Sequence, residues 1–147
     1  MRIQQYNSVD TVTTLERKQI IDFLFKHLDE FGDTWESISN AIDYALNPGP
    51  AFGGFILFTK EDDEVIGAVV MNHTHMAGYI PENVLVYIAV HREHRGKGIG
   101  KVLMEHAIKN AKGDIALHVE DNNPAKFLYE KVGFTNPYLE MRYKNKN

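Results

Sequence analysis

The chain has 147 residues, of which 44% are hydrophobic and 24% charged, so we expect a single folded domain over residues 1–147. Its net charge of −4 argues against a broad surface for nucleic acid or for an anionic membrane. Because the chain contains no cysteine, a disulfide framework, a thiolate metal site and catalysis through a cysteinyl intermediate are excluded.

The first fifty residues carry one strand pattern and two helix patterns. Residues 2–6 alternate like a short strand, and apolar residues then recur near helical spacing over 15–28. Gly32 and Asp33 interrupt this helix. Asp33 with Glu36 three residues later is typical of a capping box, so we expect a second helix to begin there.

The middle of the chain carries strand patterns. Two apolar runs, 55–59 and 65–71, flank the acidic segment 60–64, which predicts an antiparallel hairpin. The unbroken apolar run 84–90 suits a strand that is covered on both faces, so we expect it to be the central strand.

The second half predicts a strand, a crossover helix and a strand, because helical spacing over 99–112 precedes an apolar run at 115–119. Asn123-Pro124 indicates a further helix that ends at Gly133. Phe134 and residues 138–144 are expected to complete the sheet. The predicted fold class is α/β (α+β): a mixed, mostly antiparallel central sheet of six to seven strands, flanked by about four helices.

Between the central strand and the crossover helix lies a turn with three glycines, at positions 96, 98 and 100. The unpaired amides of a first helical turn and the helix dipole favour an anion, most naturally a phosphate. An NTPase loop is excluded because Arg95 and Val102 stand where that motif needs glycine and Ser or Thr. A dinucleotide fingerprint is excluded because its third glycine would fall on Lys101.

The pattern Arg95-x-x-Gly98-x-Gly100 after a long apolar strand resembles the coenzyme A motif of the GNAT family, the Gcn5-related N-acetyltransferases. Residues 122–134 resemble that family's second signature: an Asn, an Ala three residues later, a Tyr four residues after that, and a closing Gly-Phe. The resemblance implies a GNAT-like fold and an enzyme that uses acetyl-CoA as cosubstrate.

The resemblance also implies roles for individual residues. Ile88 and Val90 would pair through their backbones with the thioester carbonyl and the pantetheine arm. Asn122 would contact the coenzyme or orient the next helix, although Asn before Asn-Pro suits simple turn chemistry equally well. The pyrophosphate would be held by the backbone amides of Arg95, Gly96, Lys97, Gly98, Ile99, Gly100 and Lys101.

Tyr129 fits the general acid that protonates the departing thiolate of coenzyme A, and its alternative role is an aromatic that packs the helix on the sheet. The carboxylate that some family members place near the start of the central strand corresponds here to Val84. We therefore take Glu82, two residues earlier, as the candidate base. Water could equally link other groups to the pocket, namely His73, His75, His118 and Glu120.

Seven histidines raise the question of a metal site, particularly His73 with His75 and His91 with His94. No third ligand is positioned by the spacing, and attack of an amine on a thioester needs no metal, so we predict none.

The predicted function is direct transfer of acetyl from acetyl-CoA to a primary amine of a small or peptidic acceptor, with residues 32–35 and 72–83 as recognition elements. The alternative is a non-catalytic acyl-CoA-binding sensor or interaction domain. No signal peptide or run of roughly 20 apolar residues is present, so we expect a cytoplasmic protein without a membrane partner. The oligomeric state, including a homodimer, is left open.

Overall fold

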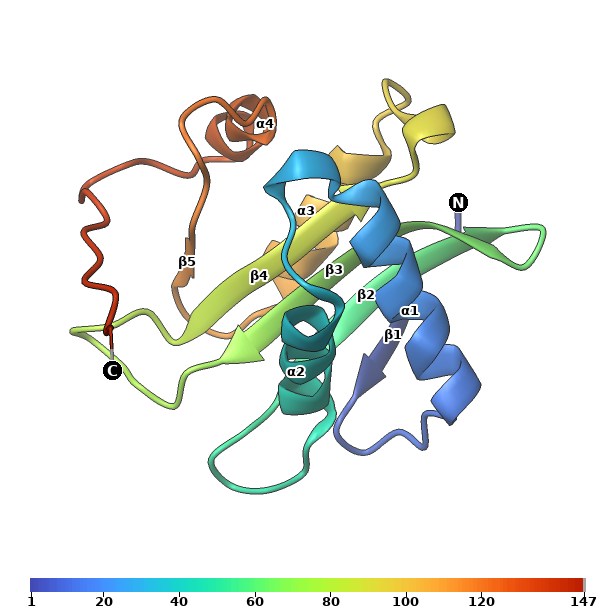
Figure 1. Cartoon of the computed structure of the whole chain (residues 1–147), viewed down its shortest axis with the longest axis horizontal. Coiled ribbons are helices and arrows are strands. Elements are labelled where there is room, and N and C mark those ends of the chain that lie inside the picture. Colours follow the sequence, from blue (N-terminus) through green and yellow to red (C-terminus); the bar gives the residue numbers. More distant parts are fainter. Residues whose placement is uncertain (147) are drawn as a thin grey trace.

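The structure is a computed structural model that describes residues 1–146, and Asn147 lies outside the described residues. None of the helices in this described part is long and apolar enough to cross a membrane. In chain order (Figure 1) the elements are β1 (Gln4–Asn7), α1 (Thr14–His27), the 3₁₀ turn η1 (Asp29–Phe31), α2 (Trp35–Leu46), β2 (Gly54–Glu61), β3 (Glu64–His73), β4 (Asn83–Val90), the 3₁₀ turn η2 (Arg92–His94), α3 (Ile99–Asn110), β5 (Ile115–Leu117) and α4 (Ala125–Lys131).

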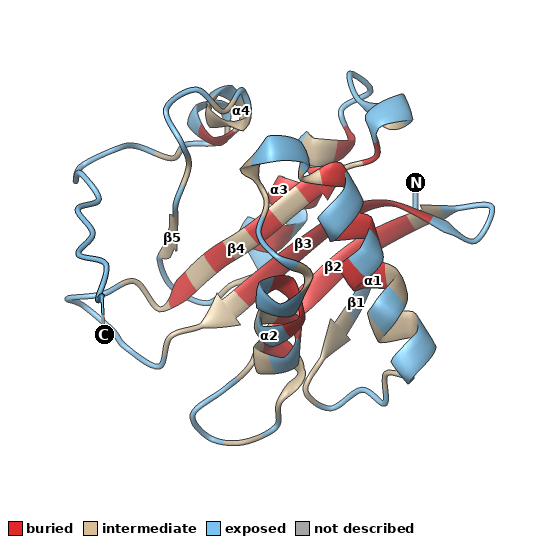
Figure 2. Ribbon diagram, viewed as in Figure 1, coloured by how far each residue is buried: buried red, intermediate tan, exposed pale blue. Residues whose placement is uncertain are grey.

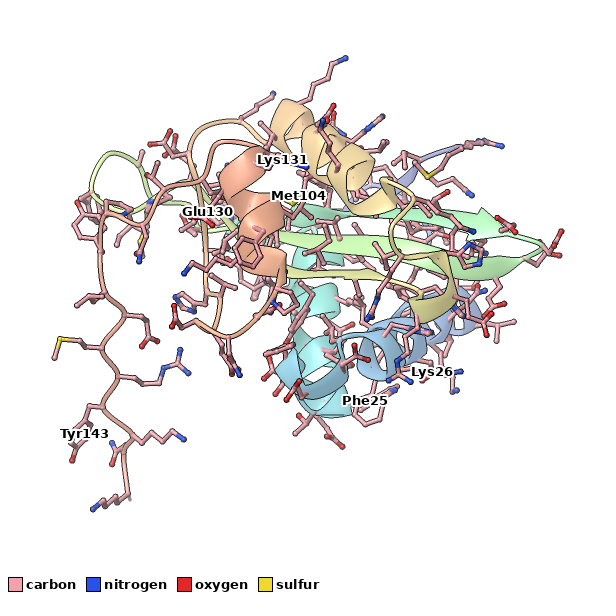
Figure 3. All side chains as sticks on the ribbon, turned by 90° about the horizontal axis from the view of Figure 1, so that it is seen from above. Phe25, Lys26, Met104, Glu130, Lys131 and Tyr143 are labelled. Carbon is pink, nitrogen blue, oxygen red and sulfur yellow. The ribbon has the colours of Figure 1, made fainter. Side chains whose placement is uncertain are left out.

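The sheet has the order β1-β2-β3-β4-β5, and its strands are antiparallel except for the parallel pair β4 and β5. Helices α1 and α2 cover one face, and α3 and α4 lie on the other (Figures 1 and 3). Four helices around a mixed, mostly antiparallel sheet confirm the predicted fold class. The described residues form five strands, fewer than the six to seven expected.

The missing strands belong to the C-terminal segment, where Phe134 and residues 138–144 were expected to complete the sheet. Residues 134–146 form no strand, and Figure 3 shows the segment leaving the sheet, with Tyr143 far from it. An alternating pattern shows which side chains would share a face, but a strand also needs an edge to pair with. The neighbouring β5 offers an edge of only three residues.

Two apolar cores lie on opposite faces of the sheet. Ile20 of α1 and Ile42 of α2 pack with strand residues in the first core, and Leu103 of α3 packs in the second. Figure 2 shows the buried residues concentrated along β2, β3 and β4. These three strands are covered on both faces, as expected for residues 84–90. The central one of the five strands in residues 1–146 is β3, so the expectation that residues 84–90 form the central strand is wrong.

A β-bulge interrupts β4 at Val86. Val70 of β3 pairs with Tyr87 and Met71 pairs with Leu85, so Val86 is the extra residue. A bulge shifts the alternation of side chains along its strand. Leu85 therefore packs in the core under α3, whereas Tyr87, two residues later, packs in the core under α1 and α2.

Candidate active site

The edge of β4 is open beyond its first three residues. Residues 83–85 pair with 115–117 of β5, and β5 ends at Leu117. Residues 86–90 of β4 continue past that point, while the chain after β5 turns towards α4 (Figure 1). The two parallel strands thus separate and leave a stretch of β4 backbone beside a gap in the sheet.

The amides of Ile88 and Val90 face this open edge. The N–H of His91 donates to the carbonyl of Ile66 on β3 over 2.8 Å. Backbone groups alternate in direction along an antiparallel strand, so those of Val90 and Ile88 point away from β3. The carbonyl of Val90 accordingly accepts a 3.0 Å hydrogen bond from Nε of Arg95. An extended ligand with amide groups can pair with such an edge.

The glycine turn lies where β4 leads into α3. Gly96 and Gly98 have φ angles of 78° and 83°, in the left-handed region that favours glycine. Gly98 is the N-cap of the twelve-residue α3 and provides no side-chain cap for the first helical amides. A Cβ atom at either glycine would meet no atom within 4 Å. The turn is therefore an open cradle of amides at a helix N-terminus, suited to an anion.

The Arg95 side chain is held by the protein itself. Its guanidinium donates to Oδ2 of Asp29 over 2.9 Å and to the carbonyl of His27 over 2.8 Å. Arg92 also binds Asp29, over 2.7 Å. These hydrogen bonds, with that from Arg95 first, lower the pKa of Asp29. The side chain of Arg95 thus connects the glycine turn to the segment between α1 and α2. Its backbone amide belongs to the turn.

Three histidines lie beside this connection. The ring centroids of His27 and His91 are 4.1 Å apart, and those of His91 and His94 are 5.3 Å apart. Nε2 of His91 lies 3.0 Å from Oε1 of Glu64, and Nδ1 of His27 accepts from the amide of Arg92. No cluster of three or more potential ligands among residues 1–146 is arranged to hold a metal.

Acid should destabilise the fold through His27. Burial, and then the neighbouring His91, lower the pKa of His27 from 6.5 to about 4. The unfolded chain therefore binds more protons between these values, so stability is full above pH 6.5 and is lost as the pH falls to about 4. We expect the free energy of unfolding to decrease by about 3 kcal/mol across this range.

Urea unfolding at a series of pH values measures this slope. The variant His27→Gln should flatten it, whatever its absolute stability, and the exposed His106→Gln should leave it unchanged. An equal slope in wild type and His27→Gln would contradict the prediction.

Tyr129 lies on α4 and is 8% exposed. Burial raises the pKa of its phenol to about 12, so the hydroxyl keeps its proton at neutral pH. Its ring packs near Phe134, with centroids 6.0 Å apart. Within residues 1–146, no hydrogen bond engages the hydroxyl. The general-acid role of Tyr129 stays a prediction, and the side chain has the protonation state that this role needs.

Glu82 lies at the closed end of the site. It precedes Asn83, where β4 and β5 are still paired, and a Cβ atom on Gly113 would stand 1.9 Å from its Oε2. Ile88 is six residues further along the strand, about 20 Å away. The structure thus does not bring Glu82 together with the Ile88 edge or the glycine turn.

The other predicted positions are spread around the fold. Asn122 is exposed, and its neighbour Asn123 makes the turn contact by accepting from the amide of Ala125 over 2.9 Å. His75 binds the carbonyl of Phe52 over 2.7 Å. His118 and Glu120 are exposed.

Asp33 has a different place from the one that the sequence predicted. Thr34 is the N-cap of α2, and its hydroxyl accepts from the amide of Ser37 over 3.1 Å. The predicted cap at Asp33 is therefore wrong, since Thr34 can serve equally well and stands one residue closer to the helix. The Asp33 carboxylate instead accepts a 2.6 Å hydrogen bond from the hydroxyl of Tyr87 on β4. The sequence holds no signal for this pair, because the two residues are 54 positions apart.

Comparison with known proteins gives partial matches among curated sequences. A cysteine-rich protein 2-binding protein of Mus musculus is 41% identical over 54 residues, which are 36% of this chain and 7% of that protein. A peptidyl-lysine N-acetyltransferase of Salmonella typhimurium is 36% identical over 75 residues, 50% of this chain and 45% of the relative. A ribosomal protein bS18-alanine N-acetyltransferase of Haemophilus influenzae is 30% identical over 87 residues, 56% of each. The chain spans less than two thirds of the length of each relative.

Solved structures match over nearly the whole chain. A ribosomal-protein-alanine N-acetyltransferase from Brucella melitensis has a TM-score of 0.65, with 17% identity and full coverage of both chains. The aminoglycoside N-acetyltransferase AAC(6')-Iy, solved in complex with CoA, has a TM-score of 0.68 with 15% identity, over 99% of this chain and 95% of the other. At these identities the likeness is one of fold. The profile of the acetyltransferase (GNAT) family matches residues 18–134, and the chain therefore belongs to the GNAT family of acetyltransferases.

Proposed function

We propose that this protein transfers the acetyl group of acetyl-CoA directly to a primary amine. The observation that carries the proposal is the joining of two features at the end of β4. An open backbone edge at Ile88 and Val90 leads straight into a glycine cradle at the N-terminus of α3. An extended thioester with a pyrophosphate at its far end needs both features, in this order.

The residues of the site fit acetyl-CoA. The amides from Arg95 to Lys101 would hold the pyrophosphate, and the amide of Ile88 would donate to the thioester carbonyl as charge develops on its oxygen. The amine nitrogen forms a bond to the carbonyl carbon as the bond from carbon to sulfur breaks. Tyr129 would give its proton to the departing thiolate and regain one from solvent.

The acceptor is proposed only as a class. The names of the matched relatives refer to N-acetylation of peptidyl lysine, of the alanine of a ribosomal protein and of aminoglycosides. These acceptors differ in size and share a primary amine. Near η1, the exposed acids Glu30 and Asp33 form no ion pair within residues 1–146, and their charge supports a cationic acceptor.

Release of free coenzyme A thiol from acetyl-CoA tests the proposal. Three probes cover the acceptor types: a lysine-free peptide with N-terminal alanine, an N-blocked peptide with one lysine, and the aminoglycoside kanamycin. We expect at least one probe to raise thiol release above the rate without amine, with the acetylated product identified by mass spectrometry. Binding of acetyl-CoA without faster release on any probe would contradict the proposal and support the non-catalytic acyl-CoA-binding domain.

A further inference from the structure

We propose that Asp33, held in place by Tyr87, is the carboxylate that binds the ammonium group of the acceptor and takes its proton. This inference rests on the proposed function, since it assigns the acceptor side of the same site. It replaces neither Tyr129 nor the glycine turn, which act on the acetyl donor.

The β-bulge at Val86 directs the Tyr87 side chain to the face of the sheet that α1 and α2 cover. Tyr87 directly precedes Ile88, whose amide faces the open edge. Tyr87 is 8% exposed, and its hydroxyl ends at the exposed Asp33. The Asp33 carboxylate is thus separated from the β4 backbone beside Ile88 by the length of the Tyr87 side chain and a 2.6 Å hydrogen bond. An amine that attacks a thioester bound at Ile88 can reach this carboxylate directly or through one bridging water.

The partner of Asp33 is a neutral phenol, so no cation cancels its negative charge. Glu16 on α1 is also held by a phenol, that of Tyr6 over 2.8 Å, but Tyr6 lies on β1, which β2 and β3 separate from β4. In residues 1–146 it forms no ion pair, and burial together with Asp33 raises the pKa of Tyr87, so the phenol keeps its proton. Glu30 and Glu36 are exposed and unanchored to the sheet. The remaining acids have other partners: Asp22 binds Lys18, Asp29 binds Arg92 and Arg95, and Asp43 binds Arg17.

Proton transfer at Asp33 balances the reaction. A primary amine arrives as an ammonium ion at neutral pH, and Asp33 accepts one proton from it and passes that proton to solvent. The free amine then attacks the thioester. The nitrogen loses a second proton as the amide forms, and the thiolate gains one through Tyr129. The net change is one acetyl transferred and one proton released.

Asp33→Asn tests the inference, because the amide keeps the size of the side chain and can still accept from Tyr87. With the best probe amine of the panel, we expect kcat/KM to fall about 30-fold at pH 7, less than the usual loss of a general base because water can substitute. The loss should shrink as the pH approaches the pKa of the amine, since the amine then arrives deprotonated. A purely structural role would give a loss that does not depend on pH. The Kd for acetyl-CoA should stay within twofold.

Tyr87→Phe keeps the Asp33 carboxylate but removes the hydrogen bond that positions it, so we expect kcat/KM to fall about fivefold with the same pH trend. Asp62→Asn is the matched control. Asp62 is exposed in the turn between β2 and β3 with φ 52°, where Asn is tolerated. It changes the charge equally and should leave kcat/KM unchanged.

The outcomes separate the two proposals. If wild type turns over an amine and Asp33→Asn retains its kcat/KM within twofold, the Asp33 role is wrong and the proposed function stands. If Glu82→Gln, rather than Asp33→Asn, shows the pH-dependent loss, the base is Glu82. If wild type acetylates none of the probes, the proposed function fails and the role of Asp33 fails with it.

Discussion

Replacing Tyr129 by Phe is expected to lower kcat about 100- to 1000-fold while the Kd for acetyl-CoA stays the same. A thiolate leaves more easily when it gains a proton, and general acids contribute in this range. The pKa of Tyr129, raised to about 12 by burial, keeps its hydroxyl protonated at neutral pH. Phe preserves the ring and its packing near Phe134, so the change removes the proton donor alone. Steady-state rates and calorimetric binding of acetyl-CoA measure both quantities.

Tyr138→Phe is the control for this experiment, because Tyr138 is 85% exposed on the C-terminal segment. It should leave kcat unchanged. If Tyr129→Phe retains kcat within threefold of wild type, the side chain only packs α4 on the sheet, and a water must protonate the thiolate.

The sequence predicted the elements whose patterns are strong and local. The unbroken apolar run at 84–90 appears as β4, and helical spacing from Ile99 appears as α3, which ends at Asn110 rather than Lys112. The hairpin of β2 and β3 was expected from two apolar runs around an acidic turn. In each case the signal lies within one continuous stretch of the chain, where the local pattern of apolar residues decides the structure.

Features that depend on contacts between residues far apart in the chain could not be predicted from the sequence. The bulge at Val86 is visible only in the register between β3 and β4. The spacing of Asp33 and Glu36 predicted a helix cap at Asp33, whereas the Asp33 carboxylate accepts a hydrogen bond from Tyr87, 54 positions along the chain. The C-terminal alternation predicted a strand that needs a pairing edge, and residues 134–146 form none. Local preference is overridden wherever a tertiary contact is stronger.

The segment between α1 and α2 connects the two halves of the proposed site. Asp29, at its start, binds Arg95 of the glycine turn. Asp33, four residues later, binds Tyr87 of β4. One short segment is therefore held both by the turn proposed for the donor and by the strand that would present the thioester.

The glycine turn supplies the second large effect that we predict. Gly98→Val should raise the Kd for acetyl-CoA about 100-fold. A β-branched residue at φ 83° is strained by about 1 to 3 kcal/mol. The turn relieves this strain by moving its amides, and each hydrogen bond to a charged group is worth about 1.5 to 3 kcal/mol. Loss of about 2.7 kcal/mol corresponds to the 100-fold change. Isothermal titration with acetyl-CoA measures it.

Gly133→Val separates loss of the cradle from backbone strain in general. Gly133 follows α4 with φ 110°, and a Cβ atom there would also meet nothing within 4 Å. It lies outside the turn between β4 and α3, so its replacement should lower the melting temperature without changing the Kd for acetyl-CoA. Equal effects of both variants on the Kd would show that strain alone weakens binding. An unchanged Kd in Gly98→Val would mean that the pyrophosphate does not bind in this turn.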